Sequence, residues 1–325
     1  MRTIALEEHF TTPAFLEGAG RAFKEGMLKS GGAYAEKIFA ALGDLGDKRI
    51  AEMDAAGLDM QLLSLNYPGT EQLEAEDAIA IARDTNDALA NAVRKYPARL
   101  AGLAALPTPA PDKAAAELQR RMGEGFKGAV INGHAQGRYL DDSFFWPILE
   151  AAEALNAPIY LHPTLPPKPV IEASFGGFSP RETFVLAGPG WGWHIETGVH
   201  VIRMVLRGVF DRFPKLQIVI GHMGEGLPFM LPRLERSGAT LPAPQFKRPL
   251  SAYLRQNVHY TFGGFNFPAT FQNLLAEVGI ERIMFSVDYP YGSMKEALTF
   301  LSGLPISAAD RERIAHKNAE ALFGL

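Results

Sequence analysis

The sequence contains eight short runs of apolar or β-branched residues, separated by longer stretches whose apolar residues recur with helical spacing. The runs are residues 3–6, 60–64, 100–104, 129–131, 158–161, 217–220, 258–261 and 283–287. Nearly continuous apolar character is typical of strands covered on both faces, and strands that alternate with helices are typical of a parallel sheet. Eight such units predict an α/β protein that forms a (β/α)8 barrel, also called a TIM barrel.

Two long insertions interrupt this alternation, one after the first strand (residues 11–47) and one after the fifth (residues 163–195). Both leave from the carboxyl ends of strands, where the active sites of such barrels are built. Because long connections are usually functional, we expect both insertions to cover the site. A length of 325 residues fits two average domains or one elaborated barrel. We expect a single barrel domain over residues 1–325.

The composition excludes several classes of function. The net charge of −4 is spread through the chain without a basic block or an acidic tail, so we expect no nucleic-acid partner and no membrane surface. The absence of cysteine excludes disulfides and thiolate metal sites. No apolar run approaches the roughly 18 residues of a membrane helix, and the first residues lack the pattern of a signal peptide. We therefore expect a cytoplasmic protein that acts on a small molecule.

Side chains that favour metal ions lie at the ends of four of the predicted strands. Glu7 and His9 end the first strand, His162 the fifth and Asp288 the eighth, while His222 follows the sixth. Successive strand residues alternate between faces, so Glu7 and His9 point to the same side. Each residue alone has an ordinary alternative: a chance polar pair, a histidine bonded to backbone, a turn cap. Together, at one end of a barrel, they predict that Glu7, His9, His162 and Asp288 bind one metal ion.

His222 has a carboxylate, Glu225, three residues after it, where the next helix is expected to begin. The helix dipole favours a carboxylate there, and that carboxylate can fix the imidazole tautomer and raise its basicity. We interpret His222 and Glu225 as an acid/base pair; the alternative is a helix cap beside a fourth nitrogen ligand. The other histidines carry weaker signals: His134 and His194 lie in loops that could reach the site, whereas His200, His259 and His316 have the pattern of structural residues.

The expected ligand set limits the metal. Two carboxylates and two imidazoles form a mixed oxygen and nitrogen site that suits Mn²⁺ or Zn²⁺, and Fe²⁺ less obviously. The residue pattern does not choose among these ions.

The chain resembles the amidohydrolase superfamily, in the branch that contains aminocarboxymuconate semialdehyde decarboxylase. The similarity rests on the segments HMGEGLPF, FSVDYPY and NAEALFGL and runs through nearly the whole chain. The segments ALEEHF and RGVFDRFPKLQIVIGHMGEGLPFMLPRLE are similar to the nonoxidative aromatic acid decarboxylases, such as γ-resorcylate and 2,3-dihydroxybenzoate decarboxylase. Most of the superfamily carries His-x-His on the first strand, whereas this chain carries Glu7-x-His9, as the resorcylate-type members do.

This resemblance implies roles for individual residues. Glu7, His9, His162 and Asp288 would be metal ligands, His222 and Glu225 a proton-handling pair, and Asn132, Phe23 and Arg233 substrate contacts. The arginine at the position of Arg233 is presented to the substrate by a neighbouring subunit, so a homodimer or homotetramer is expected.

The resemblance implies decarboxylation of an aromatic acid that carries an ortho hydroxyl group. Direct loss of CO₂ would leave an aryl carbanion, so the ring must be protonated first, with Asp288 as the expected acid and with no organic cofactor. Two alternatives stay open: a metal-dependent hydrolase or hydratase with the same ligands, and a noncatalytic binding module. Release of CO₂ from salicylate-like acids would separate them from the decarboxylase.

Overall fold

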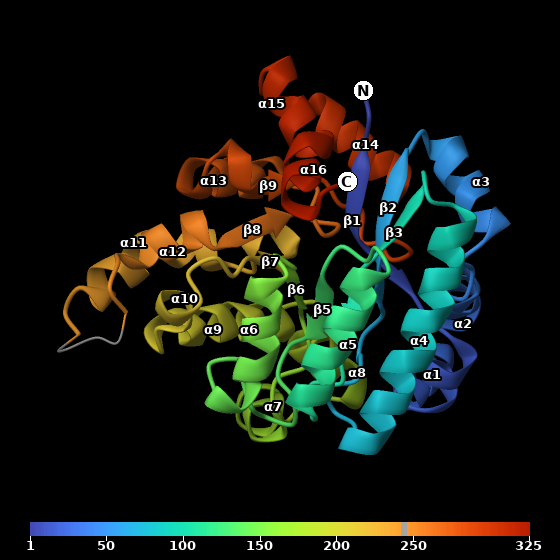
Figure 1. Cartoon of the computed structure of the whole chain (residues 1–325), viewed down its shortest axis with the longest axis horizontal. Coiled ribbons are helices and arrows are strands. Elements are labelled where there is room, and N and C mark those ends of the chain that lie inside the picture. The colour runs from blue at the N-terminus through green and yellow to red at the C-terminus, as the bar shows by residue number, and fades with distance from the viewer. Residues whose placement is uncertain (242–245) are drawn as a thin grey trace.

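In the computed structural model, residues 1–241 and 246–325 are described, and their parallel strands form the wall of a barrel (Figure 1). The strands are β1 (Ile4–Phe10), β2 (Met60–Leu65), β3 (Leu100–Gly102), β4 (Ala104–Ala105), β5 (Ala129–Asn132), β6 (Ile159–His162), β7 (Ile218–Ile220), β8 (Val258–Thr261) and β9 (Ile283–Met284). Every neighbouring pair is parallel. The predicted (β/α)8 architecture is confirmed.

The third and eighth predicted strands are less regular than the sequence indicates. The third is interrupted at Leu103, whose backbone N–H donates to Leu63 O at 2.9 Å, so it appears as β3 and β4. The eighth ends early, at Met284. Beyond it, a parallel bridge between Leu6 and Ser286 and a hydrogen bond from Leu6 N to Phe285 O at 3.1 Å join the last strand to the first.

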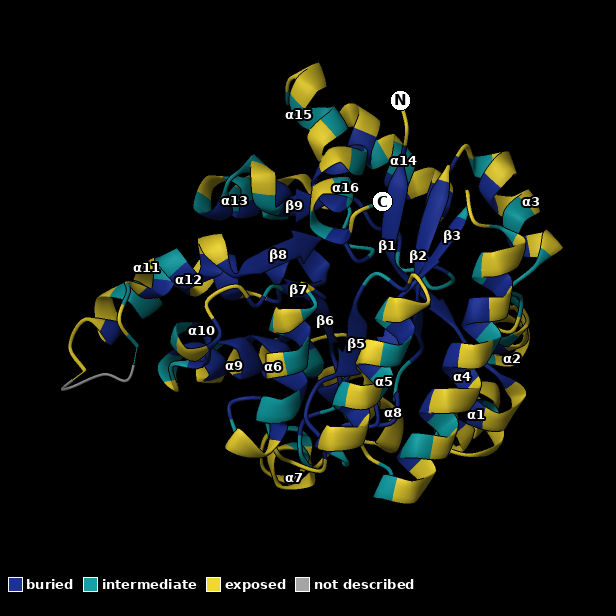
Figure 2. Cartoon of the chain, viewed as in Figure 1, coloured by how far each residue is buried: buried dark blue, intermediate teal, exposed yellow. Residues whose placement is uncertain are grey.

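Helices surround the strands, and the exposed residues lie mainly on these outer helices while the strands are buried (Figure 2). Those that follow the strands are α4 (Ala75–Lys95), α5 (Pro111–Gly123), α6 (Trp146–Ala154), α9 (Gly192–Leu206), α10 (Val209–Arg212), α11 (Leu227–Gly238), α12 (Leu250–Gln256), α13 (Pro268–Val278), α14 (Met294–Gly303), α15 (Ala308–Glu312) and α16 (Asn318–Phe323). In the described part of the chain, no helix combines the length and the apolar character needed to cross a membrane.

The two insertions are largely helical. The first forms α1 (Pro13–Glu17), α2 (Arg21–Leu42) and the start of α3 (Asp47–Ala56), and the second forms α7 (Lys168–Phe175) and α8 (Pro180–Ala187). They lie at the end of the barrel opposite the N-terminus (Figure 1). A pocket of about 590 Å³ lies between them and is lined by Phe23, Met27, Arg181 and Phe184, among others. The insertions therefore meet over the carboxyl ends of the strands.

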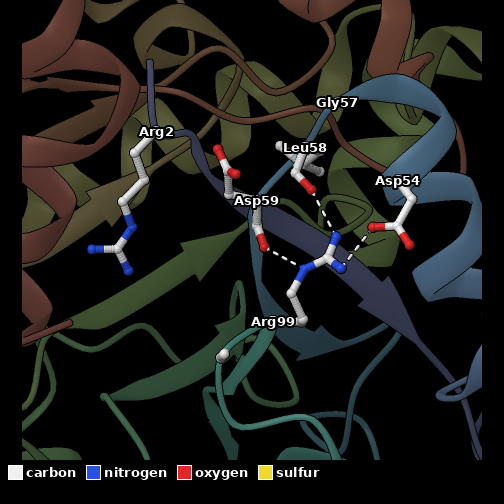
Figure 3. Close-up of a pocket in the computed structure, with 7 residues that line it drawn as sticks. Arg2, Asp54, Gly57, Leu58, Asp59 and Arg99 are labelled. Carbon is white, nitrogen blue, oxygen red and sulfur yellow. Dashed lines mark hydrogen bonds and ion pairs between the residues drawn. The ribbon is translucent and has the colours of Figure 1, made fainter.

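A second pocket, of about 510 Å³, lies at the opposite end of the barrel (Figure 3). Its polar residues precede the first three strands and form hydrogen bonds with one another and with neighbouring backbone groups. Arg99 donates to Asp54 Oδ1 at 2.7 Å and to Asp59 O at 2.7 Å, and Asp59 Oδ2 accepts from Thr3 N at 2.7 Å. These bonds tie the amino ends of β1, β2 and β3 together, which is a contribution to stability.

Candidate active site

The first strand supplies two of the candidate ligands through a local irregularity. The pairing of β1 with β2 shifts register between Ala5 and Glu8, and Glu7 within this bulge has a φ of 68°. Glu8 points away from the site. Its carboxylate accepts hydrogen bonds from Val287 N at 2.9 Å and from Gln61 Nε2 at 3.2 Å. Glu7 and His9 face the other way, as the alternation predicted.

Glu7, His9, His162 and Asp288 converge at the carboxyl end of the barrel. His9 Nε2 lies 3.2 Å from Asp288 Oδ1, and His162 Nε2 lies 3.9 Å from Glu7 Oε1. The rings of His9 and His162 are 4.9 Å apart. His162 Nδ1 lies 2.8 Å from Pro163 O, so it carries the proton and leaves the Nε2 lone pair toward Glu7.

The Glu7 carboxylate indicates that a cation belongs here. Its Oε2 accepts from Thr261 Oγ1 at 3.0 Å, but its buried Oε1 has no hydrogen-bond partner among residues 1–241 and 246–325. Burial raises the pKa of Glu7, because the charged form loses its hydration. Burial also lowers the pKa of His162 well below its usual value, and the neighbouring His9 and His222 add to this. A neutral imidazole beside an unpaired carboxylate oxygen is a fitting pair of donors for a divalent metal ion.

His222 and Glu225 form the expected pair, and a further histidine completes it. His222 Nδ1 lies 2.7 Å from Glu225 Oε1, and His194 Nδ1 lies 2.6 Å from Glu225 Oε2. Burial opposes the imidazolium of His222, but the charges of Glu225 and Glu7 outweigh it and raise its pKa to about 10. Burial would likewise raise the pKa of Glu225, yet His222 and His194 hold it at about 2. The pair is therefore an ion pair at neutral pH.

Two details of this pair differ from the sequence prediction. Glu225 lies before Gly226, the residue that caps α11, so it is not in the first turn of the helix, and its partners are the two imidazoles. The sequence predicts His194 in a loop and not as a site residue, whereas the structure places it in the first turn of α9. His194, His222 and Glu225 are also close enough to share a cation. Both Glu225 oxygens are already hydrogen bonded, however, whereas Glu7 Oε1 is not, which favours the Glu7 site for the metal.

Backbone strain is concentrated at these residues. Glu7, His222, Glu225 and Asp288 have φ values of 68°, 49°, 55° and 67°, a region that residues other than glycine rarely adopt. A Cβ added at Gly221 would collide with the Glu7 carboxylate. Such strain persists only where the surrounding structure imposes it, and it clusters at functional sites.

An aromatic wall leads from the first insertion to the candidate ligands. The ring of Phe23 lies 5.6 Å from that of Tyr67, Tyr67 lies 5.8 Å from Trp193, and Trp193 lies 6.3 Å from His162. Phe23, expected to contact substrate, is therefore separated from His162 by two rings along this wall, those of Tyr67 and Trp193. Phe265 adds a ring 5.3 Å from His222. An apolar wall beside polar ligands suits an aromatic acid.

The two other residues predicted to contact substrate, Asn132 and Arg233, lie in different parts of the structure. Asn132 ends β5, pairs in register with His162, and has a buried Oδ1 without a hydrogen-bond partner in the described part of the chain. Arg233 lies on α11 with an exposed side chain, and no hydrogen bond or ion pair among the described residues links it to the site. Asn132 is therefore beside the candidate ligands, whereas the structure does not bring Arg233 to the site of its own chain.

The remaining histidines hold the scaffold. His134 contacts Leu165 O at 3.1 Å, His200 accepts from Leu140 N at 2.9 Å, His259 contacts Gln217 Oε1 at 3.1 Å, and His316 contacts Glu320 at 2.9 Å. Burial lowers the pKa values of His200 and His259 to about 3, so both are neutral.

Comparison with known proteins gives one consistent family. The Amidohydrolase family model matches residues 29–325. A gamma-resorcylate decarboxylase of Rhodococcus jostii is 39% identical over 99% of this chain and 98% of its own. A dihydroxybenzoic acid decarboxylase of Polaromonas, solved with bound manganese and the inhibitor 2-nitroresorcinol, is 35% identical with a TM-score of 0.90, covering 100% of this chain and 97% of its own.

A 5-carboxyvanillate decarboxylase of Novosphingobium aromaticivorans, complexed with manganese and 4-hydroxy-3-methoxy-5-nitrobenzoic acid, is 34% identical with a TM-score of 0.91. This likeness covers 100% of the present chain and 96% of the other. The chain therefore belongs to the amidohydrolase family, in the branch formed by the gamma-resorcylate decarboxylases and their relatives.

Proposed function

We propose that this protein is a carboxy-lyase that removes CO₂, without oxidation, from an aromatic carboxylic acid with an ortho hydroxyl group. The observation that carries the proposal is the buried Glu7 Oε1, which has no hydrogen-bond partner in the described residues and lies near the Nε2 atoms of His162 and His222 at the carboxyl end of a barrel. Membership in a branch of aromatic acid decarboxylases supports the same reaction.

Glu7, His9, His162 and Asp288 would hold one divalent metal ion, Mn²⁺ or Zn²⁺. The manganese in two related structures favours Mn²⁺, and the donor set of two carboxylates and two imidazoles suits either ion. A bound divalent cation would act as a Lewis acid that favours the ionised form of the ortho hydroxyl. No organic cofactor is required.

The ring must gain a proton before it loses CO₂, because direct loss would leave a carbanion outside the π system. An ionised ortho oxygen donates electron density to the carbon that bears the carboxylate, and that carbon becomes basic. Asp288, whose side chain is 19% exposed at the site, donates its proton to this carbon. The bond to the carboxylate then breaks, its electrons restore the aromatic ring, and CO₂ leaves. Asp288 then takes up a proton from solvent, which is the one proton that the reaction consumes.

His222, Glu225 and His194 handle the phenol proton. Glu225 holds both imidazoles through one carboxylate, at 2.7 Å and 2.6 Å, so their orientations are fixed before substrate arrives. The protonated His222 faces Glu7 at 3.6 Å and places a positive charge beside the position of the ionised oxygen.

Substrate contacts come from Phe23, Asn132 and, we propose, Arg233 of a second copy. Arg233 lies one helical turn from Phe229, so the two side chains share a face of α11. The side chain of Phe229 is 76% exposed, which suits burial against another subunit. A homodimer or homotetramer would bring this face to the site of a neighbouring chain.

The test is turnover of hydroxylated aromatic acids by protein loaded with Mn²⁺ or Zn²⁺, followed by CO₂ release. We expect acids with an ortho hydroxyl, such as salicylate and dihydroxybenzoates, to be decarboxylated, and 4-hydroxybenzoate to be inert because its hydroxyl is too far from its carboxylate to share one metal. Hydrolysis of lactones without CO₂ release from any aromatic acid would overturn the proposal.

A further inference from the structure

Glu71 is a buried carboxylate directly behind Asn132, and the proposed reaction does not use it. It lies in the loop between β2 and α4 and is 1% exposed. Its Oε1 accepts from Asn132 N at 2.9 Å, and its Oε2 accepts from Thr70 N at 2.8 Å. Both oxygens are thus fixed by backbone donors.

The Nδ2 of Asn132 lies near Glu71 Oε2, since both atoms crowd the same point beside Gly69, and the Asn132 amide helps to hold the pKa of Glu71 down against the larger effect of burial. A carboxylate only accepts hydrogen bonds, so the Asn132 group that faces it is the Nδ2 amide. A Cβ at Gly69, whose φ is +68°, would collide with both Glu71 Oε2 and Asn132 Nδ2. The contact is therefore tight, and glycine is what allows it.

With its Nδ2 on the side of Glu71, the amide of Asn132 has its Oδ1 on the other side. That oxygen is buried and lacks a hydrogen-bond partner in the described residues, which is uncommon and marks a place where a ligand donor fits. Asn132 pairs in register with His162 on the adjacent parallel strand, so the two side chains share one face of the sheet. The free acceptor therefore lies beside the candidate metal ligands.

We propose that Glu71 is a positioning residue that fixes the Asn132 amide with its acceptor toward the ligand, so that the site prefers a second ring hydroxyl over a ring ether. The inference rests on the proposed function and refines it. A ring hydroxyl can donate a hydrogen bond to Asn132 Oδ1. A methoxy oxygen at the same place has no proton to donate, so neither it nor Oδ1 gains a hydrogen bond. An unpaired buried polar group lowers kcat/KM by about 10- to 100-fold.

The experiment compares substrates in pairs that differ only in this donor. For each dihydroxybenzoate with one hydroxyl ortho to the carboxylate, kcat and KM are measured beside the ether in which the other hydroxyl is methylated. Salicylate, which lacks the second group, is the internal control. Assays at pH 8 keep Glu71 ionised, since burial raises its pKa to about 7.

The wild type should prefer the best dihydroxy acid over its ether by about 10- to 100-fold. Asn132→Ala should abolish the preference. Glu71→Gln, which keeps the shape but replaces one oxygen with a donor, should free the amide to turn, so that the preference disappears or reverses while kcat on salicylate stays within about twofold. Glu71→Gln with an unchanged preference, or with an equal loss on all substrates, would overturn the proposal.

Calorimetric binding of resorcinol and 3-methoxyphenol to the same proteins separates this inference from the proposed reaction. A wild type that binds resorcinol more tightly, with the difference lost in Asn132→Ala and Glu71→Gln, supports the role of Glu71 even if no acid is decarboxylated. Equal binding of both phenols to all three proteins contradicts that role even if CO₂ is released.

Discussion

Glu225 shows how single residues shape this site. Its carboxylate joins His194 and His222, which are 28 residues apart in the sequence, and each of its two oxygens is hydrogen bonded to one of them. Glu7 has the opposite character, because its buried Oε1 has no hydrogen-bond partner among the residues that the structure describes. We therefore propose different roles for the two carboxylates: Glu225 orients imidazoles, and Glu7 binds the metal ion.

Two substitutions should separate these roles. We expect His162→Ala to lose both the bound metal and the activity, because it removes a neutral nitrogen donor beside Glu7. His222→Asn should keep the metal and lower kcat by about 10² to 10⁴, the usual contribution of a general acid or base. Elemental analysis and steady-state kinetics on the same preparations measure both effects.

Further variants act as controls for that pair. Glu225→Gln should do less damage than His222→Asn, because it weakens orientation and basicity but keeps the imidazole. His200→Asn, at a buried histidine that bonds Leu140 N, should leave the metal content unchanged. Loss of metal from His222→Asn would show that His222 is a metal ligand and would refute the assignment of His222 to acid/base chemistry.

The sequence predicted most of these residues because each follows a strand. The chain order of strands in a barrel is fixed, so residues at strand ends meet without any knowledge of the loops. His194 was missed for the converse reason: it enters the site on α9 after a long insertion, and no periodicity tells where such a segment returns. The positive φ of Glu7 and the bulge in β1 were also invisible, since they depend on the closed barrel.

At the scale of elements, Arg49 connects the first insertion to the strand that carries the ligands. Its guanidinium, 1% exposed, donates to Asp44 O at 2.7 Å, Gln61 Oε1 at 3.1 Å, His9 O at 2.8 Å and Ala41 O at 3.0 Å. It also lies 4.7 Å from the centre of the Tyr289 ring. One side chain of α3 thus holds the ends of α2 and β1 together.

Replacing Arg49 with Lys should therefore destabilise the protein although the charge is kept. A lysine ammonium cannot reach all four acceptors of the planar guanidinium, so buried carbonyl groups lose their donors. We expect a loss of about 2–4 kcal/mol in the free energy of unfolding, measured by urea denaturation. Arg94→Lys, at an exposed position on α4, should change it by less than about 0.5 kcal/mol. An unfolding midpoint for Arg49→Lys equal to that of the wild type would contradict this account.

The elements themselves were predicted unevenly. The barrel strands were found because buried parallel strands are almost purely apolar, although Leu103 and Met284 mark irregularities that the pattern did not reveal. The insertions were expected to cover the site, and they do meet there, but their helices were not foreseen. The glycine and proline residues within 163–195 indicate an irregular segment, so the short helices α7 and α8 were not predicted. Helices this short depend on tertiary contacts more than on intrinsic helix propensity.

At the scale of the whole molecule, the exposed face of α11 predicts an assembly. If Arg233 serves the site of a neighbouring subunit, Arg233→Ala and His222→Asn should each inactivate the protein alone. Co-refolding the two chains in equal amounts should recover about a quarter of wild-type activity, because half of the resulting dimers are hybrids with one intact site. Sedimentation or light scattering gives the assembly state of the same samples. Full activity in a monomer would contradict this prediction. The organisation of residues 1–325 as a single domain also stays a prediction.

The bridge between Leu6 and Ser286 has a consequence for how the protein is made. It joins the first strand to the last, so Glu7 and Asp288 come together only where the two ends of the barrel wall meet. A nascent chain on the ribosome exposes Glu7 long before Asp288 has been synthesised. If Glu7 and Asp288 are metal ligands, as we propose, the complete ligand set cannot form before residue 288 has left the ribosome, so the metal ion binds late in the folding of the chain.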